Sequence, residues 1–167
     1  LLSVGAFVAE LWMVFIGWFL NQTARASYQH VLLQELLGPL TARQAMSPDP
    51  ETVGPDVPVD ALVHDYFLRR PYNAFPVVQD DVLVGMVTLN GLQDLPREAW
   101  EGKVAAHVMV PLEKLVLVDP ETPMVQVLER MQNSESRRVL VARDWELMGI
   151  ISASDIARWL DRVALMD

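Results

Sequence analysis

Few residues of this 167-residue sequence have the type and spacing that chemistry requires. The three histidines, His30, His64 and His107, are scattered along the chain without the spacing of metal ligands. The sequence contains no cysteine, which excludes disulfides and cysteine-ligated metals, and it shows no pairing of a nucleophile with a base. It therefore predicts no catalytic residue and no metal ligand, and we do not expect these residues to form an enzyme by themselves.

Composition restricts the partners. The formal net charge is −9, and an acidic surface of this kind repels phosphate backbones, so we expect no nucleic-acid partner. Half of the chain is apolar (51%), which is enough for a hydrophobic core. The chain begins with Leu1 rather than Met, and we expect it to be a piece of a longer protein.

Residues 1–20 form an apolar run with a single charge, Glu10. A helix of that length spans about 30 Å, the thickness of a bilayer core, which favours a transmembrane helix. The alternative is a buried or oligomer-forming helix, and Glu10 supports it, because a carboxylate at the bilayer centre costs about 2–3 kcal/mol or more.

Residues 21–41 read as a connecting helix that continues from the apolar run and stops at Gly38-Pro39. Arg25 and Arg43 follow the apolar run, and basic residues in this position favour the cytoplasmic side of a membrane. We therefore expect a membrane-anchored chain whose remaining residues lie in the cytoplasm.

The rest of the chain is an internal repeat. Two offsets, 63 and 64 residues, relate the copies, so one small insertion separates them. The matching segments are Met46-Ser47-Pro48 with Met109-Val110-Pro111, Phe75-Pro76-Val77-Val78 with Val139-Leu140-Val141-Ala142, and Gly85-Met86-Val87-Thr88 with Gly149-Ile150-Ile151-Ser152.

Each copy has the same order of signals after its Met-x-Pro segment. A short extended stretch leads to a helix opened by Pro, two apolar runs follow with an acidic turn between them, and a last helix closes the copy. This order predicts an α/β (α+β) fold of two β-α-β-β-α modules, residues 42–95 and 105–164, joined by a linker at 96–104. Since about 60 residues bury a poor core alone, we expect the modules to pack together around an approximate two-fold axis.

This ordered set of motifs, Met-x-Pro, apolar-Pro-Val and Gly-apolar-apolar-Thr/Ser-x-x-Asp, resembles CBS domains over residues 42–164. The resemblance implies a regulatory pair that dimerises and that binds AMP, ADP or ATP in a cleft between the modules. It also implies that a Thr or Ser lies near a phosphate and that an Asp binds the ribose hydroxyls. In the second copy these two residues are Ser152 and Asp155.

Two alternatives stay open at these positions. Ser152-Ala153-Ser154-Asp155 is also a capping-box pattern, in which the serine caps the helix and the acid reaches back. Arg137 and Arg138, just before Val139, match basic residues that reach phosphates in the family, but they are equally well explained as a solvated pair. In the first copy Gly91 stands where the acid should be, so we expect one nucleotide site, formed by Asp155, Ser152, Arg137, Arg138 and Val139.

A second resemblance concerns the parent protein. Residues 11–28 and the linker segment Leu95-Pro96-Arg97-Glu98-Ala99-Trp100 are similar to site-2 protease zinc metalloproteases that carry a CBS tail. That family's HExxH and Asp-Gly zinc motifs are absent from this sequence, so the resemblance implies that the zinc and the catalytic part lie upstream of Leu1. The alternatives are a dimerisation module with a vestigial ligand site, and the CBS tail of a transporter or channel.

Overall fold

The computed structural model describes residues 35, 37–134 and 137–165. The chain divides into two compact units, Leu1–Pro39 and Leu40–Asp167, and the second unit contains both copies of the repeat. The apolar segment 1–20, expected to span a membrane, lies outside the described residues, as does nearly all of the connecting helix. Among the residues that are described, no helix is long and apolar enough to cross a bilayer.

The second copy of the repeat provides most of a four-stranded sheet in the order β1-β7-β6-β5. Strands β6 (Arg138–Arg143) and β7 (Glu146–Ser152) form an antiparallel hairpin, and β5 (Leu117–Val118) pairs in parallel with β6. The fourth strand, β1 (Ser47–Pro48), comes from the first copy and pairs antiparallel with β7.

The first copy forms the matching sheet in the order β2-β3-β4. Strands β2 (Ala74–Gln79) and β3 (Val82–Thr88) form its hairpin, and β4 (Val110–Pro111) is supplied by the second copy. A single parallel bridge between Val53 and Val77 stands where β5 stands in the other sheet. Each copy therefore gives its Met-x-Pro strand to the sheet of the other, which is the reciprocity expected of a two-fold relation.

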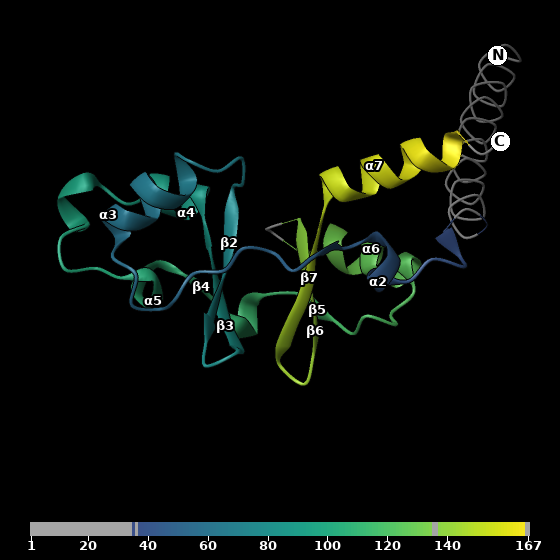
Figure 1. Cartoon of the computed structure of the whole chain (residues 1–167), viewed down its shortest axis with the longest axis horizontal. Coiled ribbons are helices and arrows are strands. Elements are labelled where there is room, and N and C mark those ends of the chain that lie inside the picture. Colours follow the sequence, from purple (N-terminus) through teal and green to yellow (C-terminus); the bar gives the residue numbers. More distant parts are fainter. Residues whose placement is uncertain (1–34, 36, 135–136, 166–167) are drawn as a thin grey trace, which may run out of the picture. The chain divides into compact units, whose positions relative to one another are not determined.

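The helices surround these sheets (Figure 1). The first copy contributes α2 (Ala42–Ala45), α3 (Val59–Ala61) with the π-helical turn η1 (Leu62–Phe67), and α4 (Leu89–Gln93), and the linker contains the 3-10 turn η2 (Arg97–Ala99). The second contributes α5 (Ala105–Val108), the 3-10 turn η3 (Leu112–Lys114), α6 (Met124–Gln132) and α7 (Ala153–Ala164). The helix that the sequence predicts after Pro58 in the first copy thus changes to π geometry after Ala61.

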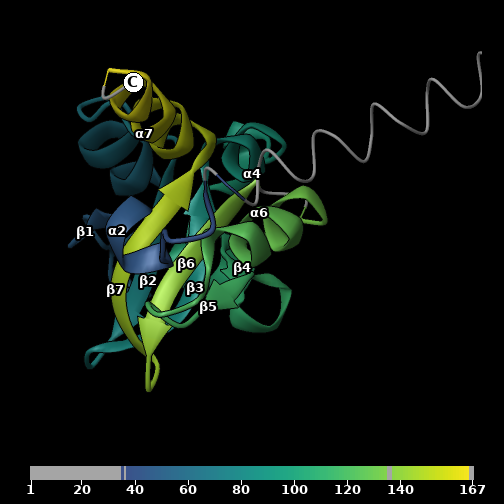
Figure 2. The same cartoon turned by 90° about the vertical axis from the view of Figure 1, so that its right-hand side faces the viewer.

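The two copies share apolar packing between their sheets. Leu83 and Met86 of β3 and Leu140 of β6 form one buried cluster, in which each side chain is at most 1% exposed. Figure 2 shows the β6–β7 hairpin lying across the β2–β3 hairpin. Burial of a large apolar side chain contributes about 1.5–3 kcal/mol, so this cluster holds the copies together as one α+β unit, as the sequence predicts.

Candidate functional site

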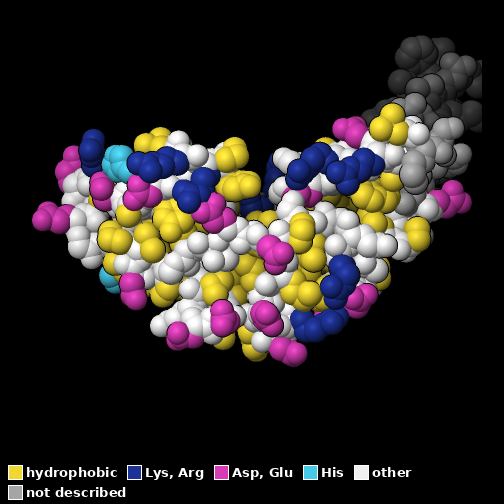
Figure 3. All heavy atoms as spheres, in the orientation of Figure 1, with side chains coloured by type: hydrophobic (Ala, Val, Ile, Leu, Met, Phe, Trp, Pro, Cys, Tyr) yellow, Lys and Arg dark blue, Asp and Glu magenta, His cyan; other side chains and the backbone are white. Residues whose placement is uncertain are grey.

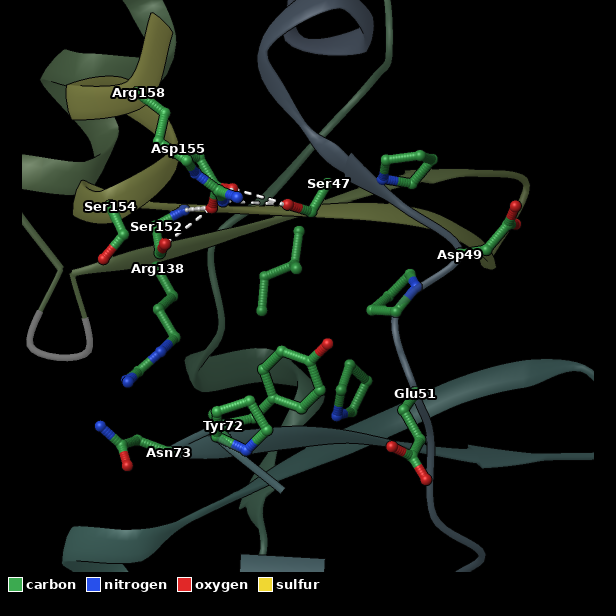
Figure 4. Close-up of a pocket in the computed structure, with 16 residues that line it drawn as sticks. Ser47, Asp49, Glu51, Tyr72, Asn73, Arg138, Ser152, Ser154, Asp155 and Arg158 are labelled. Carbon is green, nitrogen blue, oxygen red and sulfur yellow. Dashed lines mark hydrogen bonds and ion pairs between the residues drawn. The ribbon is translucent and has the colours of Figure 1, made fainter. Parts of the chain in front are cut away.

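A cavity of about 430 Å³ lies beside the first turn of α7 (Figure 4). Its walls come from both copies of the repeat. The first copy contributes residues 47–51, 71–74 and Pro76, and the second contributes Arg138, Ile150, Ser152, Ser154, Asp155 and Arg158. The exchanged strand β1 brings Ser47 to the edge of β7, so residues more than a hundred positions apart face one another across this cavity.

Asp155 is the buried charged residue at the centre of a hydrogen-bond network, with 7% of its surface exposed. Its Oδ2 accepts hydrogen bonds from the Ser152 backbone N–H at 2.8 Å and from the Ser152 hydroxyl at 2.6 Å. Its Oδ1 accepts a hydrogen bond from the Ser47 hydroxyl at 2.6 Å and another from the Arg158 guanidinium, which also forms an ion pair with it.

The network keeps this carboxylate charged. Burial by itself would raise the pKa of Asp155, but the hydrogen bonds from Ser152 and Ser47 and the positive charge of Arg158 outweigh burial and hold the pKa below its ordinary value. A buried carboxylate that is ionised at neutral pH is a strong acceptor for hydroxyl donors.

The capping-box pattern is half realised. The carboxylate of Asp155 reaches back to the N–H of Ser152, as the pattern predicts, while the Ser152 hydroxyl donates to that same carboxylate. Asp155 therefore braces the start of α7 and lines the cavity at the same time. The two interpretations of the motif are compatible in this geometry.

Arg138 and Ser152 are paired across β6 and β7, which places both side chains on the same face of the sheet. The Arg138 side chain extends along the cavity toward Asn73 of the first copy (Figure 4). Partial burial lowers the pKa of the Arg138 guanidinium from its ordinary value, but an arginine stays protonated at neutral pH because that ordinary value is so high. Arg138 is thus a positive charge held at the end of the cavity.

A model of the CBS domain family matches residues 42–95 and 105–162. The chain belongs to the CBS domain family. Two relatives with zinc metalloprotease names match it: Rip3 of Mycobacterium tuberculosis, 30% identical over 94% of this chain and 40% of its own length, and MJ0392 of Methanocaldococcus jannaschii, 27% identical over 100% and 46%. The chain thus spans less than half the length of these relatives. Their names confirm the resemblance to zinc metalloproteases that the sequence indicates.

Solved CBS structures share the fold at low sequence identity. CBSX2 from Arabidopsis thaliana, in complex with AMP, superposes with a TM-score of 0.66 at 24% identity, covering 74% of this chain and 98% of its own. The CBS domain of a bacterial CNNM/CorC family Mg²⁺ transporter, in complex with ATP, gives 0.60 at 19% identity, with 78% and 92% covered. These comparisons establish the fold of the CBS pair.

Three of the five residues expected to form its site, Asp155, Ser152 and Arg138, line the cavity, and two do not. Val139 follows Arg138 on β6, faces the opposite side of the strand and is fully buried in the core. Arg137 precedes β6 in a left-handed backbone conformation (φ 49°) and is not among the lining residues.

The family resemblance predicts a cleft between the modules, but all the site residues expected from the sequence belong to the second copy, and none belongs to the wall formed by the first copy. Tyr72 packs edge-on against Phe75, with ring centroids 6.0 Å apart, and its hydroxyl points into the cavity (Figure 4). Glu51, another lining residue, pairs with Arg70 at 2.5 Å. A local signal existed only for Arg158, which is three residues after Asp155 and so on the same helix face.

Metal ligation has no candidate in the described part of the CBS pair. No three side chains of the His, Asp or Glu type come together there in a group that could hold an ion.

Proposed function

We propose that this CBS pair is a regulatory module that binds one adenosine nucleotide in the cavity beside Asp155. The observation that carries the proposal is a buried, ionised carboxylate that lines a cavity built from both modules. A carboxylate can accept hydrogen bonds from two neighbouring hydroxyls, as a ribose presents them, and each such bond contributes about 1.5–3 kcal/mol. CBS neighbours of the same fold bind AMP and ATP.

The proposed position of the phosphate follows from the remaining charges. Arg138 and Ser152 lie side by side on β6 and β7, and the first N–H groups of the twelve-residue helix α7 open next to them. A guanidinium and a helix N-terminus together suit an anion, while the Ser152 hydroxyl beside them donates its proton to Asp155. The ribose at Asp155 and the phosphate toward Arg138 would then place the base at the wall formed by the first copy.

We further propose that the pair controls a membrane-anchored zinc metalloprotease of which it forms a part, as a homodimer in the cytoplasm. The zinc metalloprotease names of the relatives support this parent. The zinc would belong to the protease domain, and residues 1–20 would provide the membrane anchor. Ligand binding would act on the protease only through a difference in affinity between two arrangements of the pair.

Titration calorimetry of the 167-residue chain with AMP, ADP and ATP tests the nucleotide site. We expect one site per chain, and we expect Asp155→Ala to weaken binding by roughly 10- to 150-fold, since it removes about 1.5–3 kcal/mol. Asn90→Ala, in the corresponding helix of the first copy, is the matched control and should leave the affinity unchanged. Circular dichroism of each variant separates lost binding from lost structure.

A vestigial site in a purely dimerising module is the second candidate, and one observation favours it. All the donors that Asp155 needs are already supplied by the protein itself. No binding up to millimolar nucleotide, or binding that is indifferent to Asp155→Ala in a folded protein, would leave this candidate in place of the regulatory one.

A further inference from the structure

The carboxylate of Asp155 has no acceptor position left for a ligand. An ionised carboxylate accepts about four hydrogen bonds, two on each oxygen. The Ser152 N–H and hydroxyl take both positions on Oδ2, and Ser47 and Arg158 take both positions on Oδ1. A ligand hydroxyl that binds Asp155 must therefore displace one of these donors.

The two oxygens differ in how easily they can be vacated. The donors on Oδ2 belong to Ser152, three residues away, and they are fixed by the start of α7. The donors on Oδ1 come from elsewhere. The Arg158 side chain is 65% exposed and can turn into solvent, and Ser47 is on β1, which belongs to the other copy. Oδ1 is thus the oxygen at which exchange is possible.

We infer that the Ser47 hydroxyl is an internal substitute for a ligand hydroxyl, and that nucleotide binding at Asp155 releases Ser47 and so loosens β1 from β7. The inference rests on the proposed nucleotide site. The Ser47 hydroxyl makes at Oδ1, at 2.6 Å, the same kind of bond that a ribose hydroxyl would make. Ser47 and ligand then compete for one acceptor, and occupancy of the cavity is coupled to the exchanged strand.

Strand β1 is suited to respond because its pairing with β7 is short, although the preceding Met46 also packs against Gly149. It consists of two residues, one of which is Pro48, and proline has no N–H to donate to β7. Beyond it, the Asp49 N–H bonds to the Met148 carbonyl at 3.2 Å. The strand follows directly after α2, which connects it to the preceding residues of the chain. Release of Ser47 would therefore be felt in the segment that joins the pair to the rest of its protein.

One substitution tests this competition by the direction in which it changes the affinity for AMP. In titration calorimetry with AMP we expect Ser47→Ala to bind about two- to tenfold more tightly than the wild type, since one hydrogen bond no longer opposes the ligand. Val110 is the equivalent residue on β4 of the other sheet, and Val110→Ala is the matched control with unchanged affinity. Weaker or unchanged binding by Ser47→Ala, with normal binding by the wild type, would overturn the inference and leave the nucleotide site standing.

A second measurement needs no substitution. Amide hydrogen exchange of the wild-type chain, with and without saturating AMP, reports on the Asp49 N–H directly. We expect AMP to make exchange at Asp49 severalfold faster, whereas a ligand that only added contacts would slow it. Slower exchange at Asp49 overturns the inference, and no AMP binding by the wild type overturns the proposed function together with it.

Discussion

The two halves of the CBS pair share their strand exchange and differ in the polar network next to it. Ser47, Ser152, Asp155 and Arg158 of the second sheet correspond, at the repeat offsets of 63 and 64, to Val110, Thr88, Gly91 and Asp94. Thr88 caps α4 in the simplest way, with its hydroxyl accepting a hydrogen bond from the Gly91 N–H at 3.1 Å. The first half therefore contains no carboxylate at the helix start, no hydroxyl on the exchanged strand and no cation one turn further on.

This difference separates what the fold requires from what it does not. Both halves keep a glycine, Gly85 or Gly149, against which the methionine of the Met-x-Pro segment packs. Only one half keeps the buried charge, and the other half folds without it. The Asp155 network is thus not required by the CBS fold, which supports the proposed role in ligand binding.

The largest expected effect is a loss of stability at the two glycines, Gly85 and Gly149, that hold the same position in the two copies. A Cβ on Gly85 would lie 2.7 Å from the Val110 carbonyl oxygen, which is backbone and cannot move aside, whereas the three atoms nearest to a Cβ on Gly149 all belong to the Met46 side chain. Overpacking costs about 1–3 kcal/mol or more, so Gly85→Ala should lower the free energy of unfolding by about 3 kcal/mol and Gly149→Ala by about 1 kcal/mol. Urea denaturation measures both, and equal losses would show that β4 shifts as freely as Met46.

The next effect concerns the charge that distinguishes the halves. Asp155→Asn should lower the free energy of unfolding by about 2 kcal/mol at pH 7, because the buried network loses its anion. The folded protein holds the pKa of Asp155 below its ordinary value of 3.8, so the stabilisation is complete above that pH and declines as the pH falls through the lowered pKa.

Unfolding of wild type and Asp155→Asn between pH 7 and pH 2.5 tests this dependence. The difference between the two proteins should shrink toward the acid end. Asp161→Asn, on an exposed position of the same helix, is the control and should stay within about 0.5 kcal/mol of the wild type. A difference that is constant with pH would mean that shape rather than charge is lost at Asp155.

Local patterns in the sequence predicted the two hairpins better than they predicted the exchange of strands between the copies. The repeat offsets and the acidic turns correctly indicated the hairpins β2–β3 and β6–β7, because hairpin partners are close in sequence. The pairing of Ser47 with Ile150 joins residues far apart, and no local pattern reports it. The sequence therefore predicted cavity-lining residues on β6, on β7 and at the start of α7, and none on β1. Strand alternation also explains why Arg138 faces the cavity and Val139 does not, whereas Arg137 precedes the strand in a left-handed backbone conformation.

A transplant would sharpen the comparison. Gly91→Asp places an acid at the equivalent position of the first half. It should stabilise the protein by at most about 0.5–1 kcal/mol, since glycine disfavours helix and an acid suits a helix start, while the new Cβ would lie 3.1 Å from the Thr88 hydroxyl oxygen, which must shift slightly. We expect no second nucleotide to bind, because Ala74 stands where the second half has Arg138 and Asp94 adds a negative charge where it has Arg158. Thermal denaturation and calorimetric stoichiometry give the two readouts. Two bound nucleotides per chain would show that the acid alone makes the site.

The smallest expected effect is a difference in stability between glycine variants of the two hairpin turns. Asp81 and Trp145 hold the same position in the β2–β3 and β6–β7 turns, with positive φ values of 65° and 67°. The left-handed conformation costs most side chains about 1–2 kcal/mol, but Asp tolerates it better than Trp. The Trp145 side chain is 60% exposed, so its removal loses little packing. The hydrogen bond from the Leu83 N–H to the Trp145 carbonyl, at 3.1 Å, does not need the indole.

Trp145→Gly should therefore raise the free energy of unfolding by about 0.5 kcal/mol, a net gain that already includes the loss from glycine's greater freedom in the unfolded chain. Asp81→Gly should leave the free energy of unfolding unchanged or lower it slightly. Urea denaturation of both variants decides the order, and a destabilised Trp145→Gly would show that the indole packs on the protein in solution.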